Sequence, residues 1–121
     1  MSMPTSAQFD RIRNQVTINA FAIICGRETV ARVRVVRPCR LRTGMERFSA
    51  LVETWQGGSY NAAIGRAGGC GYDKVAAAQA DAIRQLGFDG HKANCSRQFA
   101  APAIAEGLGL PAGSWQTVEL V

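Results

Sequence analysis

The chain is organised around the stretch Gly65-Arg66-Ala67-Gly68-Gly69-Cys70-Gly71-Tyr72-Asp73-Lys74, which leads into an Ala-rich run from Val75 to Leu86. Glycine lacks a Cβ, so it lets the backbone turn where other residues would clash. The run that follows has apolar residues at helical spacing, with Asp73 placed as its N-cap and Gly87 as its stop. The pattern predicts a strand, a glycine-rich turn and a helix over 73–86.

This glycine-rich turn has two interpretations. In the first, the free N–H groups at the helix start bind an anion or an acidic side chain. That interpretation assigns Gly68, Gly69 and Gly71 to an anion-binding loop, Arg66 and Lys74 to charge, and Tyr72 to a stacking or anchoring contact. In the second, the glycines only shape a tight strand-to-helix connection that holds no ligand. The sequence supports both.

Alternating side chains predict three consecutive strands before the helix. The first covers residues 29–36, with Ala31, Val33 and Val35 on one face and Arg32 and Arg34 on the other, and it ends at Pro38. The second covers residues 46–56. The third covers residues 60–66, joined to the second by a hairpin turn whose two glycines accept positive φ angles. Short links of this kind are typical of an antiparallel meander.

Three further elements are predicted at the two ends of the chain. Phe9, Ile12, Val16, Ala20 and Ile23 recur at helical spacing and predict a helix over 6–25, ended by Gly26. The β-branched residues 16–18 leave a strand over 15–24 as the alternative. A short helix begins at Ser96 or Ala101 and runs to Leu108; the later start is preferred because proline suits a first turn. A last strand covers 114–121.

These elements predict one α+β domain over residues 1–121. Its antiparallel sheet has three or four strands, with the 73–86 helix packed on one face and the 6–25 helix beside it. The expected core consists of Val33, Val35, Leu51, Val52, Ile64, Val75, Ile83 and Leu86. Each fully buried large aliphatic side chain contributes roughly 1.5–3 kcal/mol.

The charge is concentrated in one segment. The chain has a formal net charge of +5, and residues 27–47 alone carry seven arginines and two glutamates, which also sums to +5. Arginine's planar fork suits phosphate and carboxylate partners. The segment, with Arg32, Arg34, Arg40 and Arg42, is therefore either a contact surface or a solvated strand face with a loop.

Known catalytic and metal-binding patterns are missing from the sequence. The phosphate-binding P-loop, the dinucleotide fingerprint and the nucleophile elbow all fail to match, and the acidic residues do not cluster. The one histidine, His91, and nearby Cys95 make a single close pair, short of a zinc site's four ligands. We therefore predict no enzyme activity, no cofactor and no metal. Residues 1–6 lack a secretory pattern and no run has 18 apolar residues, so we expect a cytoplasmic protein without a membrane span.

The order Ile64 to Lys74 followed by an Ala-rich helix resembles a group of small proteins from bacteriophages and mobile elements that carry a Gly-Gly-x-Gly-Tyr-x-Lys motif. The resemblance covers residues 52–86 and leaves the arginine-rich segment outside. Cys70 stands where those relatives carry another residue. The resemblance implies a protein that acts by binding, in the manner of inhibitors of host defences such as CRISPR systems.

Two functions follow as expectations. The leading one is a non-enzymatic binding protein that inhibits a host defence complex of the CRISPR-effector kind, through its basic surface in the host cytoplasm. The alternative is direct binding of a nucleic acid or nucleotide by the arginine-rich segment and the glycine-rich loop. The chain is expected to be a monomer, or a homodimer paired through the edge strand 114–121.

Overall fold

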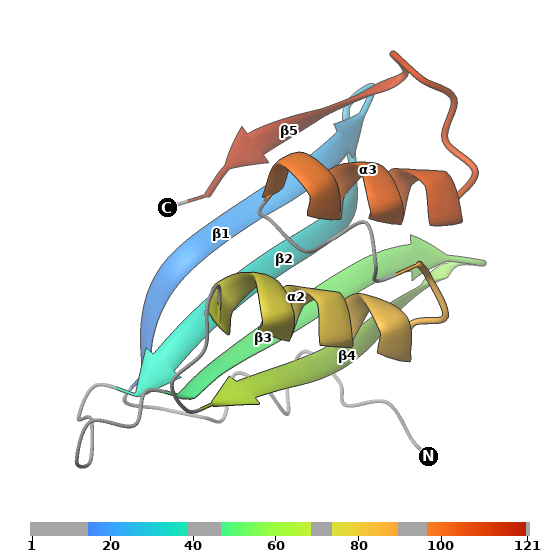
Figure 1. Ribbon diagram of the computed structural model, residues 1–121. Helices are drawn as coiled ribbons and strands as arrows, with labels where there is room; N and C mark the ends of the chain where they lie inside the picture. The colour runs from blue at the N-terminus through green and yellow to red at the C-terminus, as the bar shows by residue number, and fades with distance from the viewer. Residues whose placement is uncertain (1–14, 39–46, 69–73, 90–96, 121) are drawn as a thin grey trace.

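The computed structural model describes residues 15–38, 47–68, 74–89 and 97–120. They form an antiparallel sheet with two helices on one face (Figure 1). The elements are β1 (Gln15–Cys25), β2 (Glu28–Pro38), β3 (Arg47–Gln56), β4 (Ser59–Gly68), α2 (Lys74–Gln85), α3 (Arg97–Gly107) and β5 (Trp115–Glu119). The strand order is β4-β3-β2-β1-β5. The α+β class is therefore confirmed, and the sheet has five strands where three or four were predicted.

The prediction of a helix over 6–25 is wrong for residues 15–25, which form strand β1. Residues 6–14 lie outside the described part of the chain. Strand β1 pairs with β2 on one side and β5 on the other. Ala20, Phe21, Ala22 and Ile23 are all buried, so both faces of the strand are apolar there. The alternative strand over 15–24 is confirmed, and Gly26, with φ +65°, occupies a hairpin turn and not a helix end.

The predicted meander over residues 29–66 is confirmed. Strand β2 ends at Pro38, and β3 and β4 flank the two-residue turn Gly57-Gly58, whose φ angles of +58° and +87° are both positive. The register pairs Val33 with Val52 and Leu51 with Ile64. Val33 and Val35 of β2 lie in the main core, so the alternation predicts the buried face of this strand correctly.

Helix α2 confirms the predicted helix over 73–86 and packs closely on β4. A Cβ placed on Gly65 would overlap the backbone oxygen of Ala78 and stand 2.5 Å from the backbone nitrogen of Ala82. The helix ends as predicted at Gly87, which has φ +87°. The N–H of Phe88 donates to the Ile83 carbonyl at 3.2 Å, which closes the last turn.

Helix α3 starts four residues before the preferred Ala101, so Pro102 lies inside the helix and not in its first turn. Ala100, Ala101 and Ile104 are buried on both sides of this proline, while Pro102 itself is exposed. Burial of that apolar stripe outweighs the one helical hydrogen bond that proline cannot donate. Strand β5 matches the predicted last strand and forms one edge of the sheet.

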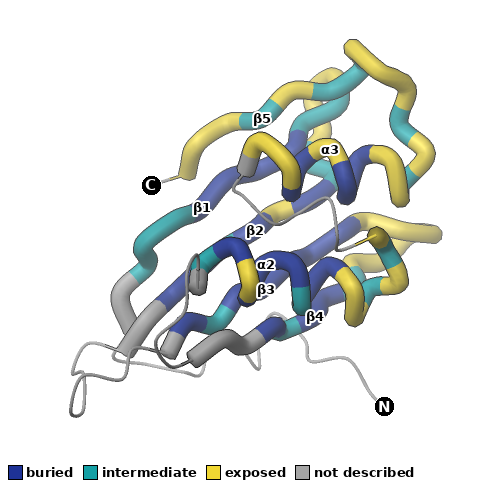
Figure 2. The backbone as a smooth tube through the Cα atoms, viewed as in Figure 1, coloured by how far each residue is buried: buried dark blue, intermediate teal, exposed yellow. Residues whose placement is uncertain are grey.

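The main core lies between the sheet and the two helices. It contains six of the eight predicted core residues: Val33, Val35, Val52 and Ile83 are buried, and Val75 and Leu86 are partly buried against them. Its other large side chains are Phe21, Ile23, Phe48 and Ile104. Leu51 and Ile64 pack instead with Val36 and Ala62 in a second cluster. Burial follows the central strands, whereas β5 and the hairpin ends are largely exposed (Figure 2).

Within the described residues, neither helix is long and apolar enough to cross a membrane.

Candidate functional site: an aromatic–arginine patch

The predicted arginine ladder lies on the sheet face opposite α2 and α3, which we call the second face. On β2, Arg32 and Arg34 alternate with the buried residues Ala31, Val33 and Val35 that face the helices. The β2–β3 register sets Arg32 opposite Glu53 and Arg34 opposite Leu51. The ladder is confirmed as a feature of one face, and its neighbours come from the adjacent strands.

Arg32 forms an ion pair with Glu53. Its Nη2 lies 2.5 Å from Oε2 of Glu53, a charge-assisted hydrogen bond across the β2–β3 ladder. The Glu53 side chain is only 7% exposed, whereas that of Arg32 is 47% exposed. A buried carboxylate needs such a partner, and the ion pair with Glu53 fixes one end of the Arg32 guanidinium.

Tyr60 holds the same guanidinium from a second direction. The Cζ of Arg32 lies 5.2 Å from the centre of the Tyr60 ring, within cation–π range. The Tyr60 hydroxyl donates to the Thr29 carbonyl at 3.3 Å, which ties β4 to the start of β2. The ring therefore has contacts at its face and at its hydroxyl, and its position is set by both.

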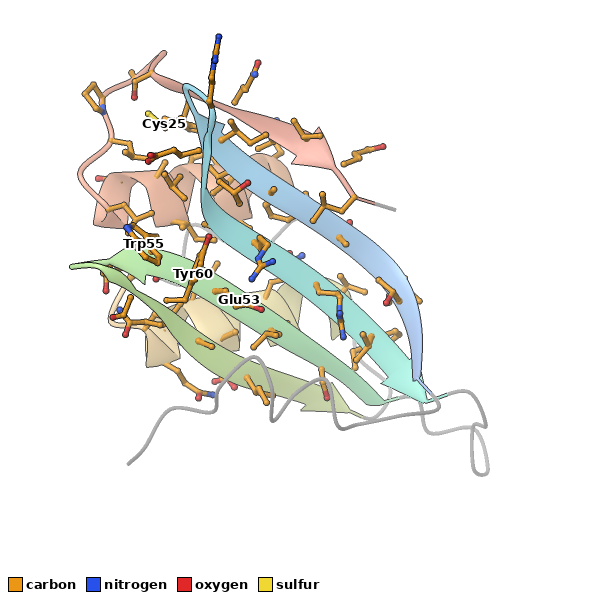
Figure 3. The ribbon with its side chains drawn as sticks, turned by 180° about the vertical axis from the view of Figure 1, so that it is seen from behind. Cys25, Glu53, Trp55 and Tyr60 are labelled. Atoms are coloured by element: carbon orange, nitrogen blue, oxygen red, sulfur yellow. The ribbon has the colours of Figure 1, made fainter. Side chains whose placement is uncertain are left out.

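Trp55 completes the group. It stands opposite Tyr60 where β3 and β4 approach their turn, and the two rings meet edge to face with centres 4.8 Å apart at 72°. Both rings remain 44% exposed. We call Arg32, Glu53, Trp55 and Tyr60 the aromatic–arginine patch. Figure 3 labels Glu53, Trp55 and Tyr60, seen from the side away from the helices.

A shallow hollow borders the patch. Glu28, Thr29, Trp55 and Tyr60 line a cavity of about 280 Å³ at the β1–β2 hairpin end of the sheet. On the other side, the patch borders a small cluster of buried apolar residues, Val36, Leu51 and Ala62. The patch thus combines a charged group, two exposed rings and a small recess.

The remaining predicted site residues are only partly described. Arg34 is half-buried on the second face. The backbone of Arg66 pairs with Ser49, β4 ends at Gly68 and α2 begins at Lys74, so the predicted strand and helix are confirmed, while residues 69–73 between them lie outside the described part of the chain. The other predicted contacts, Arg40, Arg42, Gly69, Gly71 and Tyr72, lie outside the described residues. Anion binding by the loop stays a prediction.

The search for chemistry gives little beyond the patch. His91 and Cys95 lie outside the described part of the chain. Within that part, no three His, Cys, Asp or Glu side chains gather as a metal site would require. Cys25 is a free, half-buried thiol. Gly65, which opens the sequence motif, has a packing role, because it gives α2 room to approach β4.

Three residues of the patch, Glu53, Trp55 and Tyr60, are not among the predicted site residues. Glu53 belongs to the predicted alternation of β3, yet nothing local marks it as the partner of Arg32, 21 residues away. A lone acidic residue in an otherwise apolar strand stretch, opposite a strand with two arginines, is the signal that would have identified Glu53.

A scan against protein-family models, a search of curated proteins and a search of solved structures each returned no match.

Proposed function

We propose that this protein is a non-enzymatic binding protein that contacts a partner protein through the aromatic–arginine patch. The observation that carries the proposal is that Trp55 and Tyr60 stay 44% exposed although each is held by defined contacts. Tryptophan, tyrosine and arginine are the residues that most often dominate protein interfaces. A prearranged group of the three loses little side-chain entropy on binding.

The arrangement favours a protein partner over a nucleic acid. The charge of Arg32 is engaged by Glu53, so the patch is not a row of bare cations that would follow a phosphate backbone. The Arg32 side chain is 47% exposed, and its guanidinium suits one further carboxylate next to an apolar surface, since guanidinium donors bind carboxylates in a defined geometry. The proposed partner surface is therefore apolar at its centre with an acidic group beside it.

The finer proposal comes from the motif resemblance. It makes the protein a phage or mobile-element product that inhibits a host defence complex of the CRISPR type in the host cytoplasm. Arg34 would extend the contact along the second face. The residues assigned to flanking contacts are Arg40, Arg42, Arg66, Tyr72 and Lys74, with Gly68, Gly69 and Gly71 allowing close approach.

Quantitative capture from host lysate tests the leading proposal. The tagged wild type is compared with the double variant Trp55→Ala/Tyr60→Ala and with Phe99→Ala, a matched control that removes an exposed ring from α3. We expect a partner that the wild type and the control recover equally and that the double variant recovers at about a tenth of that level or less. Recovery of the same proteins by all three would contradict the proposal. Circular dichroism confirms that each variant is folded.

The excess of arginine in residues 27–47 supports nucleic-acid binding as the second candidate. Mobility-shift assays with mixed DNA and RNA at about 50 mM salt separate the two functions, because phosphate contacts are strongest at low salt. The leading proposal expects no shift. A shift whose affinity falls linearly with salt on a log–log plot would favour the second candidate.

A further inference from the structure

Strand β5 presents an open edge with defined backbone groups. The N–H of Leu120 donates to the Ala20 carbonyl at 2.9 Å, and the same register pairs Val118 with Ala22 and Gln116 with Ile24. Hydrogen-bonded pairs alternate along an antiparallel ladder. The residues between them, Trp115, Thr117 and Glu119, therefore direct their N–H and C=O groups away from β1, toward the outside of the sheet.

The opposite edge of the sheet, formed by β4, is in contact with a helix. Helix α2 packs over β4, and the side chain of Gln85 donates to the Ile64 carbonyl at 2.7 Å. Among the described elements, β1 is the only strand that pairs with β5. Strand β5 also lacks the lysine, proline or bulge that commonly blocks an edge from pairing with another chain. Val118 and Leu120 beside it are 40% and 53% exposed.

A groove runs beside this edge on the helix side of the sheet. Its volume is about 520 Å³, and its lining includes Trp115, Thr117 and Glu119 of β5, Asn19 of β1, and Gln98 and Pro102 of α3. Side chains of a strand alternate between the two faces of its sheet. A strand added at β5 would therefore place every second side chain next to the groove and the others next to Val118 and Leu120.

The charge in the groove lining selects the occupant. Among the described residues that line the groove, Glu119 is the charged one. A second copy of β5 would bring like charge to this edge, whereas a basic segment would complement it. The position lies at the far edge of the sheet from β4 and on the helix side, away from the aromatic–arginine patch (Figure 1).

We propose that the β5 edge binds an extended basic segment of a partner protein as a sixth strand, with alternate basic side chains entering the groove beside Trp115 and Glu119. Main-chain hydrogen bonds to Trp115, Thr117 and Glu119 supply affinity, and the groove supplies the preference for basic side chains. This binding mode uses residues that the aromatic–arginine patch does not, so either surface functions without the other.

The test uses two synthetic peptides, acetyl-TKVKVKT-amide and its acidic counterpart acetyl-TEVEVET-amide, titrated into the isotope-labelled full chain and followed by amide NMR. The basic peptide is expected to shift the amide signals of Trp115, Thr117 and Glu119 and to slow their hydrogen exchange. It is expected to bind at least about tenfold more tightly than the acidic peptide at low salt. Equal affinities, or no response on β5, overturn the proposal.

Two variants at one position isolate the main-chain contact. Thr117→Pro removes an outward N–H and leaves the β1 ladder intact, because proline is tolerated where the N–H faces away from the sheet. Thr117→Val is the matched control, since it keeps both the N–H and the side-chain shape. We expect Thr117→Pro to abolish peptide binding and Thr117→Val to retain it. Equal binding by the two variants overturns the proposal.

A third variant keeps the test decisive if Thr117→Pro does not fold. Glu119→Lys preserves every main-chain group and is expected to reverse the preference, so that the acidic peptide binds more tightly. An unchanged preference contradicts the assigned role of the groove. Sedimentation of the wild type tests whether a second copy of the chain binds at this edge instead. A concentration-dependent dimer that Thr117→Pro eliminates would identify that second copy and overturn the peptide assignment.

Discussion

Replacing Gly65 by alanine tests whether the glycine-rich motif begins with a packing residue or a ligand-binding one. A Cβ at this position would overlap the backbone oxygen of Ala78 and stand 2.5 Å from the backbone nitrogen of Ala82. Both atoms belong to the main chain of α2, so no side-chain rotation relieves the contact. The helix must move away from β4, and the contacts that it makes on the sheet are disturbed.

The expected change in the free energy of unfolding of Gly65→Ala combines two opposing effects. Removing a glycine from a strand stabilises by roughly 0.5–1 kcal/mol, because the unfolded chain has less freedom. Overpacking a well-packed site costs roughly 1–3 kcal/mol, and a main-chain contact belongs at the upper end of that range. The net expectation for Gly65→Ala is a loss of roughly 2 kcal/mol. For a chain of 121 residues, this corresponds to a melting temperature lower by roughly 8 °C.

Urea and thermal unfolding measure the loss, and a second variant tests its cause. The Cβ of Ala82 would lie 3.1 Å from the added methyl group, farther than the two main-chain atoms. Ala82→Gly is therefore not expected to rescue Gly65→Ala. If Gly65→Ala is as stable as the wild type, or if Ala82→Gly restores it, the packing role is wrong. A stable Gly65→Ala protein that loses only its partner would instead support a ligand-binding role.

Three further substitutions test the contacts described above, each by urea unfolding. Arg32→Ala is expected to lower the free energy of unfolding by about 1–2 kcal/mol, because it removes one ion-pair partner of the buried Glu53 carboxylate, and adding Glu53→Gln should recover part of that loss; a strictly additive double variant would contradict the pair. Gln79→Met is expected to raise the free energy of unfolding by about 1–2 kcal/mol, because both side-chain polar atoms of this fully buried residue lack a hydrogen-bond partner, and a destabilised variant would refute this. Gly58→Ala is expected to cost about 1 kcal/mol, because its φ of +87° strains residues with a Cβ, and an unchanged stability would show that the turn relaxes.

Local pattern was sufficient for the elements that have one buried and one polar face. Strand β2 alternates arginine with valine, and its face assignment is correct for every described residue of the ladder. The Gly57-Gly58 turn has the positive φ angles that its composition indicates. Helix α2 has its expected length because Gly87 adopts the left-handed conformation that ends it. In these elements the local sequence pattern is enough to predict which face is buried.

Strand β1 shows where local pattern fails. It lies between β2 and β5, and its residues Ala20 to Ile23 are buried on both faces. A strand that is apolar on both faces loses its two-residue alternation. The apolar residues that remain at intervals of three or four then match helical spacing by accident. Recognising β1 required knowing that β5, some ninety residues later, would cover its other edge.

For the candidate site too, some features are visible in the sequence and others depend on how the strands pair. The arginines of β2 and the exposed aromatic residues are visible in the sequence, but the choice of Glu53 as the partner of Arg32 depends on the register between β2 and β3. That register is a long-range property. A slip of one residue would turn Glu53 toward the helices and leave Arg32 without its buried counter-charge.

Net charge counted along the chain therefore does not give the potential of a surface. Residues 27–47 carry the whole formal excess, yet Arg32, at the centre of the described basic strand, is engaged by a carboxylate from the next strand. The groove beside β5 lies at the other edge of the sheet and has the acidic residue Glu119 in its lining. The two proposed surfaces thus demand partners of opposite character, one apolar with an acidic group and one extended and basic. Because their requirements are opposed, a single polyelectrolyte satisfies at most one of them, and binding at both surfaces requires two chemically distinct partner segments.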